Sequence, residues 1–264
     1  MKKNYIYLTV AVCALCFGFT RSGQTDRNTQ AGAGSKPSNQ SIAPFALMEL
    51  YTSEGCSNCP PAYKVVDAFL KYGRQSNQHI YLLDFHVDYF NDPWVDPYSS
   101  ARNTARQESY ARIFPGEGAF TPQMIVNGSQ VLLGSNPKKV DAAVTNALKI
   151  MPSAKIEIST AEAGKDGYVE VKFETQNIPA DSMTNIALVQ NTIVQKVLSG
   201  ENAGKTLTHH NVVRALILVP AKDGVARIPL PESANGTRPA YSIIAFRQDM
   251  NTMKIVAASG KEVE

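Results

Sequence analysis

The chain has 264 residues, of which 44% are hydrophobic and 19% are charged. This composition supports a packed core and excludes a chain that is disordered throughout. The formal net charge is +3, and the first 23 residues hold Lys2, Lys3 and Arg21 but no acidic residue. The remaining chain has equal numbers of basic and acidic residues, so no nucleic-acid surface is predicted.

Residues 1–23 are predicted to be a signal peptide. Two lysines precede an uncharged apolar run at 8–19, which is too short to span a bilayer, and no later stretch is longer. We therefore expect no transmembrane segment in the mature chain. Neither Cys13 nor Cys16 follows a small residue, which favours cleaved export to the periplasm or the cell exterior over lipid anchoring at Cys16.

The segment at 24–43 is rich in Gly, Ser, Asn and Gln, a composition typical of a flexible linker. Beyond it, apolar runs predict strands at 45–51 and 80–85. Helical spacing predicts a helix that begins at Pro60-Pro61 and stops at Gly73, and two more that follow Ser100 and Asn136. Asn127-Gly128 predicts the turn of a β-hairpin.

This order of elements predicts an α/β thioredoxin-like fold over residues 44–151, with a central mixed sheet and flanking helices. The irregular, aromatic-rich segment 86–120 is interpreted as an insertion over the active-site face. Residues 152–264 alternate apolar and polar side chains, which predicts a β-rich, mainly antiparallel, sandwich-like domain. Within it, the polar segment 200–214 is expected to form a long hairpin loop that packs on the first domain or contacts a partner.

Export leaves Cys56 and Cys59 as the cysteines of the mature chain, in a compartment where disulfides persist. A Cys-x-x-Cys pair between a strand and a helix places the first sulfur near the helix N-terminus, which stabilises a thiolate. We expect Cys56 to be an exposed nucleophile and Cys59, one turn inside the helix, to be the buried resolving cysteine. A permanent disulfide and half a zinc site are the alternatives. Because no second cysteine pair exists in the mature chain, no metal is assigned.

Five further positions are candidates for the chemistry around these cysteines. Thr121-Pro122 precedes a predicted strand, where a cis-proline would bind the backbone of a partner; the alternative is an ordinary trans proline. His86 and Asp88 leave the carboxyl end of the second strand and are candidates for proton transfer at the dithiol, although His86 also fits a hydrogen-bonded loop residue. Glu49, inside an apolar strand, is a candidate proton acceptor for Cys59 or a merely paired side chain.

Residues 49–61 (ELYTSEGCSNCPP), 85–89 (FHVDY) and 121–128 (TPQMIVNG) together resemble a family of secreted bacterial thioredoxin-like proteins that is catalogued as domain of unknown function 1223. The resemblance runs from about residue 45 through 211–214. It implies a thioredoxin-like fold and bacterial export, and it brings no established substrate. The chain lacks the Trp-Cys-Gly-Pro-Cys loop of thioredoxin itself, which leaves its redox potential open.

The leading hypothesis is an exported thiol–disulfide oxidoreductase that acts through Cys56 and Cys59 without an organic cofactor. Its partners would be exported thiol or disulfide proteins, or a redox partner. The alternative is a copper- or partner-binding exported module, in which Cu(I) is held by the two sulfurs and His86 or the cysteines form a structural disulfide. A third hypothesis is a surface-attached, adhesin-like protein that uses its β-domain.

Overall fold

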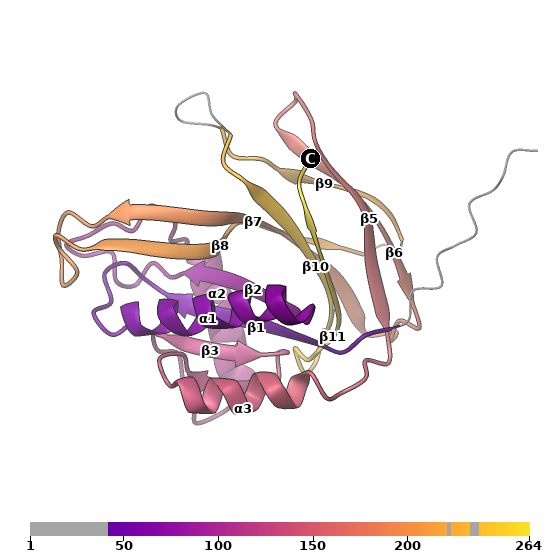
Figure 1. Cartoon of the computed structure of the whole chain (residues 1–264), viewed down its shortest axis with the longest axis horizontal. Helices are drawn as coiled ribbons and strands as arrows, with labels where there is room; N and C mark the ends of the chain where they lie inside the picture. The colour runs from indigo at the N-terminus through magenta and orange to yellow at the C-terminus, as the bar shows by residue number, and fades with distance from the viewer. Residues whose placement is uncertain (1–41, 221–222, 233–237) are drawn as a thin grey trace, which may run out of the picture. The chain divides into compact units, whose positions relative to one another are not determined.

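The computed structural model describes residues 42–220, 223–232 and 238–264 (Figure 1). The predicted signal peptide at 1–23, and all but the last two residues of the predicted linker at 24–43, lie outside the described residues. No helix within the described ranges is long and apolar enough to cross a membrane.

The first half of the described chain follows the order of elements that the sequence predicts. Its elements are β1 (Phe45–Thr52), α1 (Pro60–Ser76), β2 (His79–His86), α2 (Ala101–Ile113), β3 (Gln123–Val126), β4 (Gln130–Leu133) and α3 (Pro137–Ala147). Ser100 and Asn136 cap α2 and α3, because each side chain accepts a hydrogen bond from a first-turn N–H. Asn127 and Gly128 both have positive φ, as the predicted hairpin turn between β3 and β4 requires.

The predicted end of the first helix at Gly73 is wrong. Helix α1 continues to Ser76 and ends at Asn77, which adopts the left-handed conformation at φ 52°. Gly73 serves a different purpose, because a Cβ atom there would lie 3.2 Å from the Cβ of Ile80. Its missing side chain lets the helix lie closely on the start of β2, so this glycine permits close packing and does not stop the helix.

The second half of the chain is built of strands. They are β5 (Lys155–Ala163), β6 (Tyr168–Gln176), β7 (Ser182–Lys196), β8 (Thr206–Val219), β9 (Gly224–Pro229), β10 (Tyr241–Asp249) and β11 (Ile255–Glu262). The predicted long loop at 200–214 is too long, since β8 already begins at Thr206 and pairs with β7. Polar residues such as His209 are buried within this strand, which is why the segment resembles a loop in sequence.

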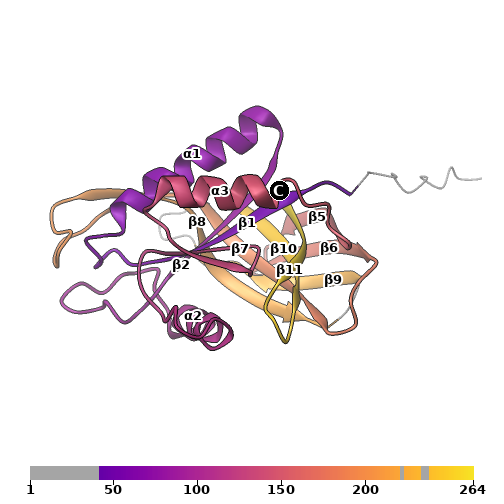
Figure 2. The ribbon, with the colours of Figure 1, turned by 90° about the horizontal axis from the view of Figure 1, so that it is seen from below.

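Eight strands form one mixed sheet in the order β11-β10-β7-β8-β2-β1-β3-β4, and β5-β6-β9 form a second, antiparallel sheet. Strands of both halves of the chain therefore share the large sheet. Helices α1 and α3 lie on one side of its strands β1 and β2, and α2 lies on the other (Figure 2). The small sheet packs its apolar side chains against those of β7 and β10.

The two halves of the large sheet meet between β2 and β8, where the pairing is short. Strands β1 and β2 are paired along their whole length, from Phe45 opposite His79 to Thr52 opposite His86. Strands β2 and β8 are parallel neighbours through one residue pair, Asp84 with Val212. Side chains must therefore supply much of the cohesion at this junction.

One such connection is a buried ion pair between β1 and α2. The Glu49 carboxylate accepts hydrogen bonds from Arg106 at 2.7 and 3.0 Å and from the hydroxyl groups of Tyr51 and Tyr110. The same guanidinium donates to Gln248 on β10 at 3.1 Å. The contacts of Glu49 thus tie the first strand, a helix and the second half of the sheet together.

Replacing Arg106 with Met should lower the free energy of unfolding by about 3–5 kcal/mol, because it leaves the Glu49 carboxylate buried without its counter-charge. Urea unfolding followed by circular dichroism measures the change. Arg112→Met on the exposed face of the same helix is the matched control and should change stability little. An equal loss of unfolding free energy in Arg106→Met and Arg112→Met would contradict the stabilising role of the Glu49–Arg106 ion pair.

Candidate functional site

Three chain segments meet at one end of the large sheet. The parallel register places Thr52, the last residue of β1, opposite His86, the last residue of β2. The antiparallel register places Gln123, the first residue of β3, opposite Tyr51, so Pro122 lies at the same end. The loop with Cys56 follows Thr52 directly. The peptide bond between Thr121 and Pro122 is cis, which excludes the alternative of an ordinary trans proline.

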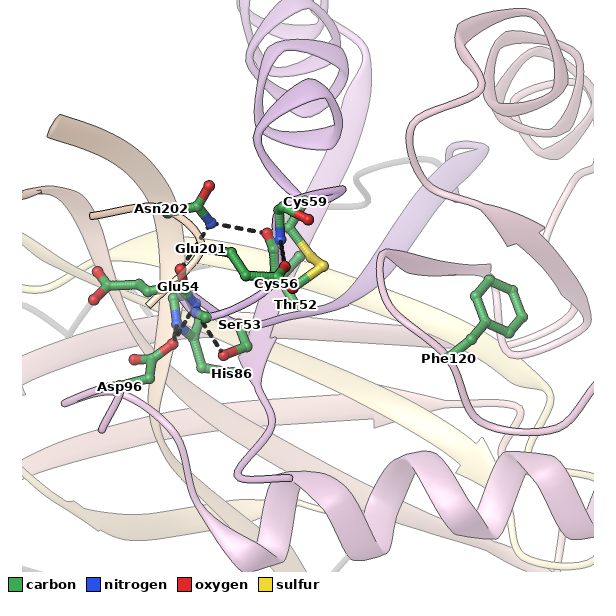
Figure 3. The surroundings of a disulfide bond; sticks show 12 residues. Thr52, Ser53, Glu54, Cys56, Cys59, His86, Asp96, Phe120, Glu201 and Asn202 are labelled. Atoms are coloured by element: carbon green, nitrogen blue, oxygen red, sulfur yellow. Dashed lines mark hydrogen bonds and ion pairs between the residues drawn. A yellow bond between two sulfur atoms is a disulfide. The ribbon is translucent and has the colours of Figure 1, made fainter. Parts of the chain in front are cut away.

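Cys56 and Cys59 form a disulfide at the start of α1, with a Cα–Cα distance of 5.5 Å (Figure 3). Two expectations about this pair are wrong. Cys56 is 2% exposed and is not an exposed side chain. Cys59 is the N-cap residue of α1 and does not lie one turn inside the helix, because Pro60 already occupies the first helical position. Both sulfurs belong to the apolar core between the sheet and α1.

The start of α1 offers few N–H groups to a thiolate. Pro60 and Pro61 have no backbone N–H, and the N–H of Ala62 donates to the carbonyl of Cys59 at 2.9 Å. The Cys59 N–H donates to the Cys56 carbonyl at 3.2 Å. The helix dipole still favours negative charge here, but the hydrogen-bond donors that usually accompany it are missing or used.

The loop at 197–205, between β7 and β8, covers the cysteine loop. The buried Asn202 amide donates to the carbonyl oxygens of Glu54 at 2.8 Å and Cys56 at 2.9 Å. The exposed Glu201 carboxylate accepts the Ser57 N–H at 3.1 Å, and hydrogen bonds from Ser57 lower the pKa of Glu201. In Figure 3, Asn202 and Glu201 lie on one side of the disulfide and Phe120 on the other. The expectation that this polar segment packs against the first half of the chain is confirmed.

A cluster of buried ionisable groups lies beneath the cysteine loop. The Glu54 carboxylate pairs with His209 Nε2 at 3.0 Å and accepts the Trp94 indole N–H at 2.9 Å. The Glu54 backbone N–H donates to Asp96 at 2.8 Å, and the same Asp96 oxygen is 2.7 Å from His86 Nδ1. The 86–120 segment therefore reaches the cysteine loop through Trp94 and Asp96.

His86 lies between two carboxylates. Its Nδ1 faces Asp96, and its Nε2 is 3.5 Å from Asp84 Oδ2. The other carboxylate oxygen of Asp84, Oδ1, accepts a hydrogen bond from the Thr52 hydroxyl at 2.9 Å. Burial alone lowers the pKa of His86, but the Asp96 and Asp84 carboxylates outweigh it and raise the pKa to about 10. The rings of His86 and His209 are 4.8 Å apart, centroid to centroid.

The remaining candidates for proton transfer are not brought to the sulfurs. Asp88 accepts the Thr104 hydroxyl of α2 at 2.5 Å. Glu49 lies on the opposite face of β1 from Cys59, because it alternates with Met48 and Leu50, which pack in the same core as the disulfide. No hydrogen bond or ion pair recorded within the described ranges joins Glu49, His86 or Asp88 to either cysteine side chain.

Sequence reasoning assigns no individual role to several residues of this site, which are Glu54, Asp84, Asp96, Asn202 and His209. One usable signal is Asp84, an acidic residue inside the apolar run 80–85. Glu54 is 155 positions from His209, and no local pattern links them.

The large mixed sheet with a second antiparallel sheet recurs in solved structures. The protein AGR_C_4864 from Agrobacterium tumefaciens is similar with a TM-score of 0.60 and 22% identity, over 83% of this chain and 94% of that one. HBP35 of Porphyromonas gingivalis is similar with a TM-score of 0.59 and 15% identity, over 84% of this chain and 76% of that one. At these levels of identity the likenesses show the fold alone, which is that of a mixed α/β protein.

Residues 47–248 match the family model described as "Protein of unknown function (DUF1223)", and the chain belongs to this family. The sequence matches none of the curated proteins.

Removing the Asn202 amide should expose the disulfide. Asn202→Ala deletes two hydrogen bonds to the cysteine loop, each worth about 1 kcal/mol, so the loop at 197–205 should open more often. We expect a phosphine reductant to reduce the disulfide roughly tenfold or more faster in this variant. The exposed Asn251→Ala is the matched control and should react like the unchanged protein. An unchanged rate in Asn202→Ala would show that the loop does not limit access.

Proposed function

We propose that this protein is an exported thiol–disulfide oxidoreductase with a thioredoxin-like arrangement of β1, α1, β2 and the β3–β4 hairpin. The observation that carries the proposal is the Cys56–Cys59 disulfide at the strand-to-helix connection, at the same end of the sheet as the cis Thr121–Pro122 bond. A dithiol in this position can close and open its disulfide with little movement of the backbone.

In the proposed reaction, the Cys56 thiolate attacks a disulfide of the partner and forms a mixed disulfide, releasing one partner thiolate. The Cys59 thiolate then attacks the Cys56 sulfur and releases the second partner thiolate. The enzyme disulfide forms, and the partner gains two electrons and, on protonation, two protons. The reverse sequence oxidises a partner dithiol. Neither direction requires an organic cofactor.

Thr121 and Pro122 would position the partner backbone beside the cysteines, where an extended segment can pair like an added strand. The Thr121 hydroxyl is buried and has no hydrogen-bond partner among the described residues, which leaves it free to bind such a segment. Because Cys56 is 2% exposed, the partner must also displace the loop at 197–205. We therefore assign this loop the role of a cover that restricts the dithiol to partners able to move it.

The burial of the disulfide also supports a second candidate, an exported partner-binding module in which Cys56–Cys59 is structural. Cys59 is 0% exposed, as is common for permanent disulfides in a core. The copper-binding form of this alternative has less support, because no contact recorded within the described residues joins His86 to either cysteine sulfur. Exchange chemistry at Cys56 separates the two candidates.

The test of the oxidoreductase proposal uses the full-length chain with Cys59→Ala. We expect this variant to form a mixed disulfide with oxidised glutathione and with exported proteins through Cys56, and reductant should reverse it. Cys56→Ala keeps the buried thiol of Cys59 and is the matched control. A folded Cys59→Ala protein that forms no mixed disulfide, even when Asn202→Ala is added to open the cover, would contradict the proposal.

A further inference from the structure

Three buried side chains converge at the junction between β2 and β8, and neither cysteine is among them. Asp84 and His86 come from β2 and His209 comes from β8, and each offers one ligand atom within 4.8 Å of the others. The side chains of the two histidines and of Asp84 are fully buried. They lie beside Val212, which forms the one residue pair between these strands.

The converging atoms have no hydrogen-bond partner. Within the described residues, six buried side-chain nitrogen or oxygen atoms are unpartnered, and three of them are Asp84 Oδ2, His86 Nε2 and His209 Nδ1. A fourth is the hydroxyl of Tyr63, whose ring packs edge-on against His209 with centroids 4.6 Å apart. Buried polar atoms are rarely left without partners, so several at one place point to a bound group, a water molecule or an ion, that satisfies them.

The second nitrogen of each histidine is held by a carboxylate. His86 Nδ1 is 2.7 Å from Asp96, and His209 Nε2 is 3.0 Å from Glu54. Histidines that bind metal ions almost always donate their other ring N–H to such a group, which orients the ring and makes the free nitrogen a better ligand. Here both histidines have this arrangement.

The contact between His86 Nε2 and Asp84 Oδ2 is longer than a charge-assisted hydrogen bond. A charge-assisted N–H···O bond is about 2.7–2.9 Å long, as the contact of His86 with Asp96 is. His86 Nε2 and Asp84 Oδ2 are instead 3.5 Å apart. Two ligands of a tetrahedral zinc ion, with bonds of about 2.0–2.1 Å, lie about 3.4 Å from each other.

We propose that Asp84 Oδ2, His86 Nε2 and His209 Nδ1 bind a divalent transition-metal ion that fastens β2 to β8. Two imidazoles and one carboxylate suit Zn²⁺, and the sulfurs take no part. Ligation needs the neutral imidazole, so binding releases any proton carried by the liganding nitrogen. The proposal does not depend on redox activity of the cysteines.

The charges of the surroundings favour a cation here. Glu54, Asp84 and Asp96 bring three buried carboxylates to two imidazoles. Even two charged imidazoles would leave one negative charge unbalanced, and buried charge is costly without a counter-charge. A divalent ion supplies two positive charges at the point where the unpartnered atoms meet.

The test is titration of the chelator-treated, full-length protein with Co²⁺ and Zn²⁺. We expect one ion per chain, visible Co²⁺ absorption without a thiolate charge-transfer band, and a higher melting temperature with Zn²⁺. His209→Gln should weaken Zn²⁺ binding by on the order of 100-fold or more, and Glu54→Gln by about 10–100-fold. His210→Gln, next to the proposed ligand and partly exposed, is the matched control and should bind normally.

Cys56→Ser together with Cys59→Ser should bind Zn²⁺ as the unchanged protein does, which separates this site from the cysteine chemistry. If the ligand variants fail to fold, the melting temperatures of the unchanged protein and of His210→Gln are compared with Zn²⁺ and with chelator. Both proteins should melt at a higher temperature with Zn²⁺. The proposal is overturned if the folded, unchanged protein binds neither ion. It is also overturned if binding survives in His209→Gln or disappears in the double cysteine variant.

Discussion

The arrangement of the site depends on one buried carboxylate, that of Glu54. It lies two residues before Cys56 and is held by His209 from β8 and by the indole of Trp94 from the 86–120 segment. Its backbone N–H is bound by Asp96. A carboxylate fully removed from water is tolerated only when it is paired and hydrogen-bonded. Three segments far apart in sequence must therefore come together for the cysteine loop to adopt its position.

The pairing of Glu54 also connects the proposed redox site with the proposed metal site, although the two sites use different residues. The disulfide packs in the apolar core at the start of α1, whereas the two histidines lie beneath it among carboxylates. His209 faces Glu54 with one nitrogen and the Asp84–His86 pair with the other. A metal ion at this point would set the position of Glu54 and hence of the cysteine loop. It would also reinforce the junction of the large sheet, which rests on one residue pair.

The sequence predicts the elements well where the signal is local. Apolar runs locate β1 and β2, Pro60 marks the start of α1, and Asn127-Gly128 marks the hairpin. The prediction fails where contacts between distant segments determine the structure. Gly73 is required by the close approach of Ile80, and the Cys56 carbonyl accepts a hydrogen bond from Asn202, 146 positions later. The pairs His86–Asp96 and His209–Glu54 have no sequence signature, because they form only after the sheet is assembled.

If Cys56–Cys59 exchanges electrons with partner proteins, its reduction potential must lie in the range of thiol–disulfide oxidoreductases. The potential would be measured by equilibrating the full-length protein with glutathione or dithiol buffers and trapping free thiols. We expect a potential between about −270 mV and about −120 mV, the range from thioredoxin to a strong disulfide oxidant. A value below about −300 mV, typical of structural disulfides, would contradict it and leave the partner-binding module as the better account.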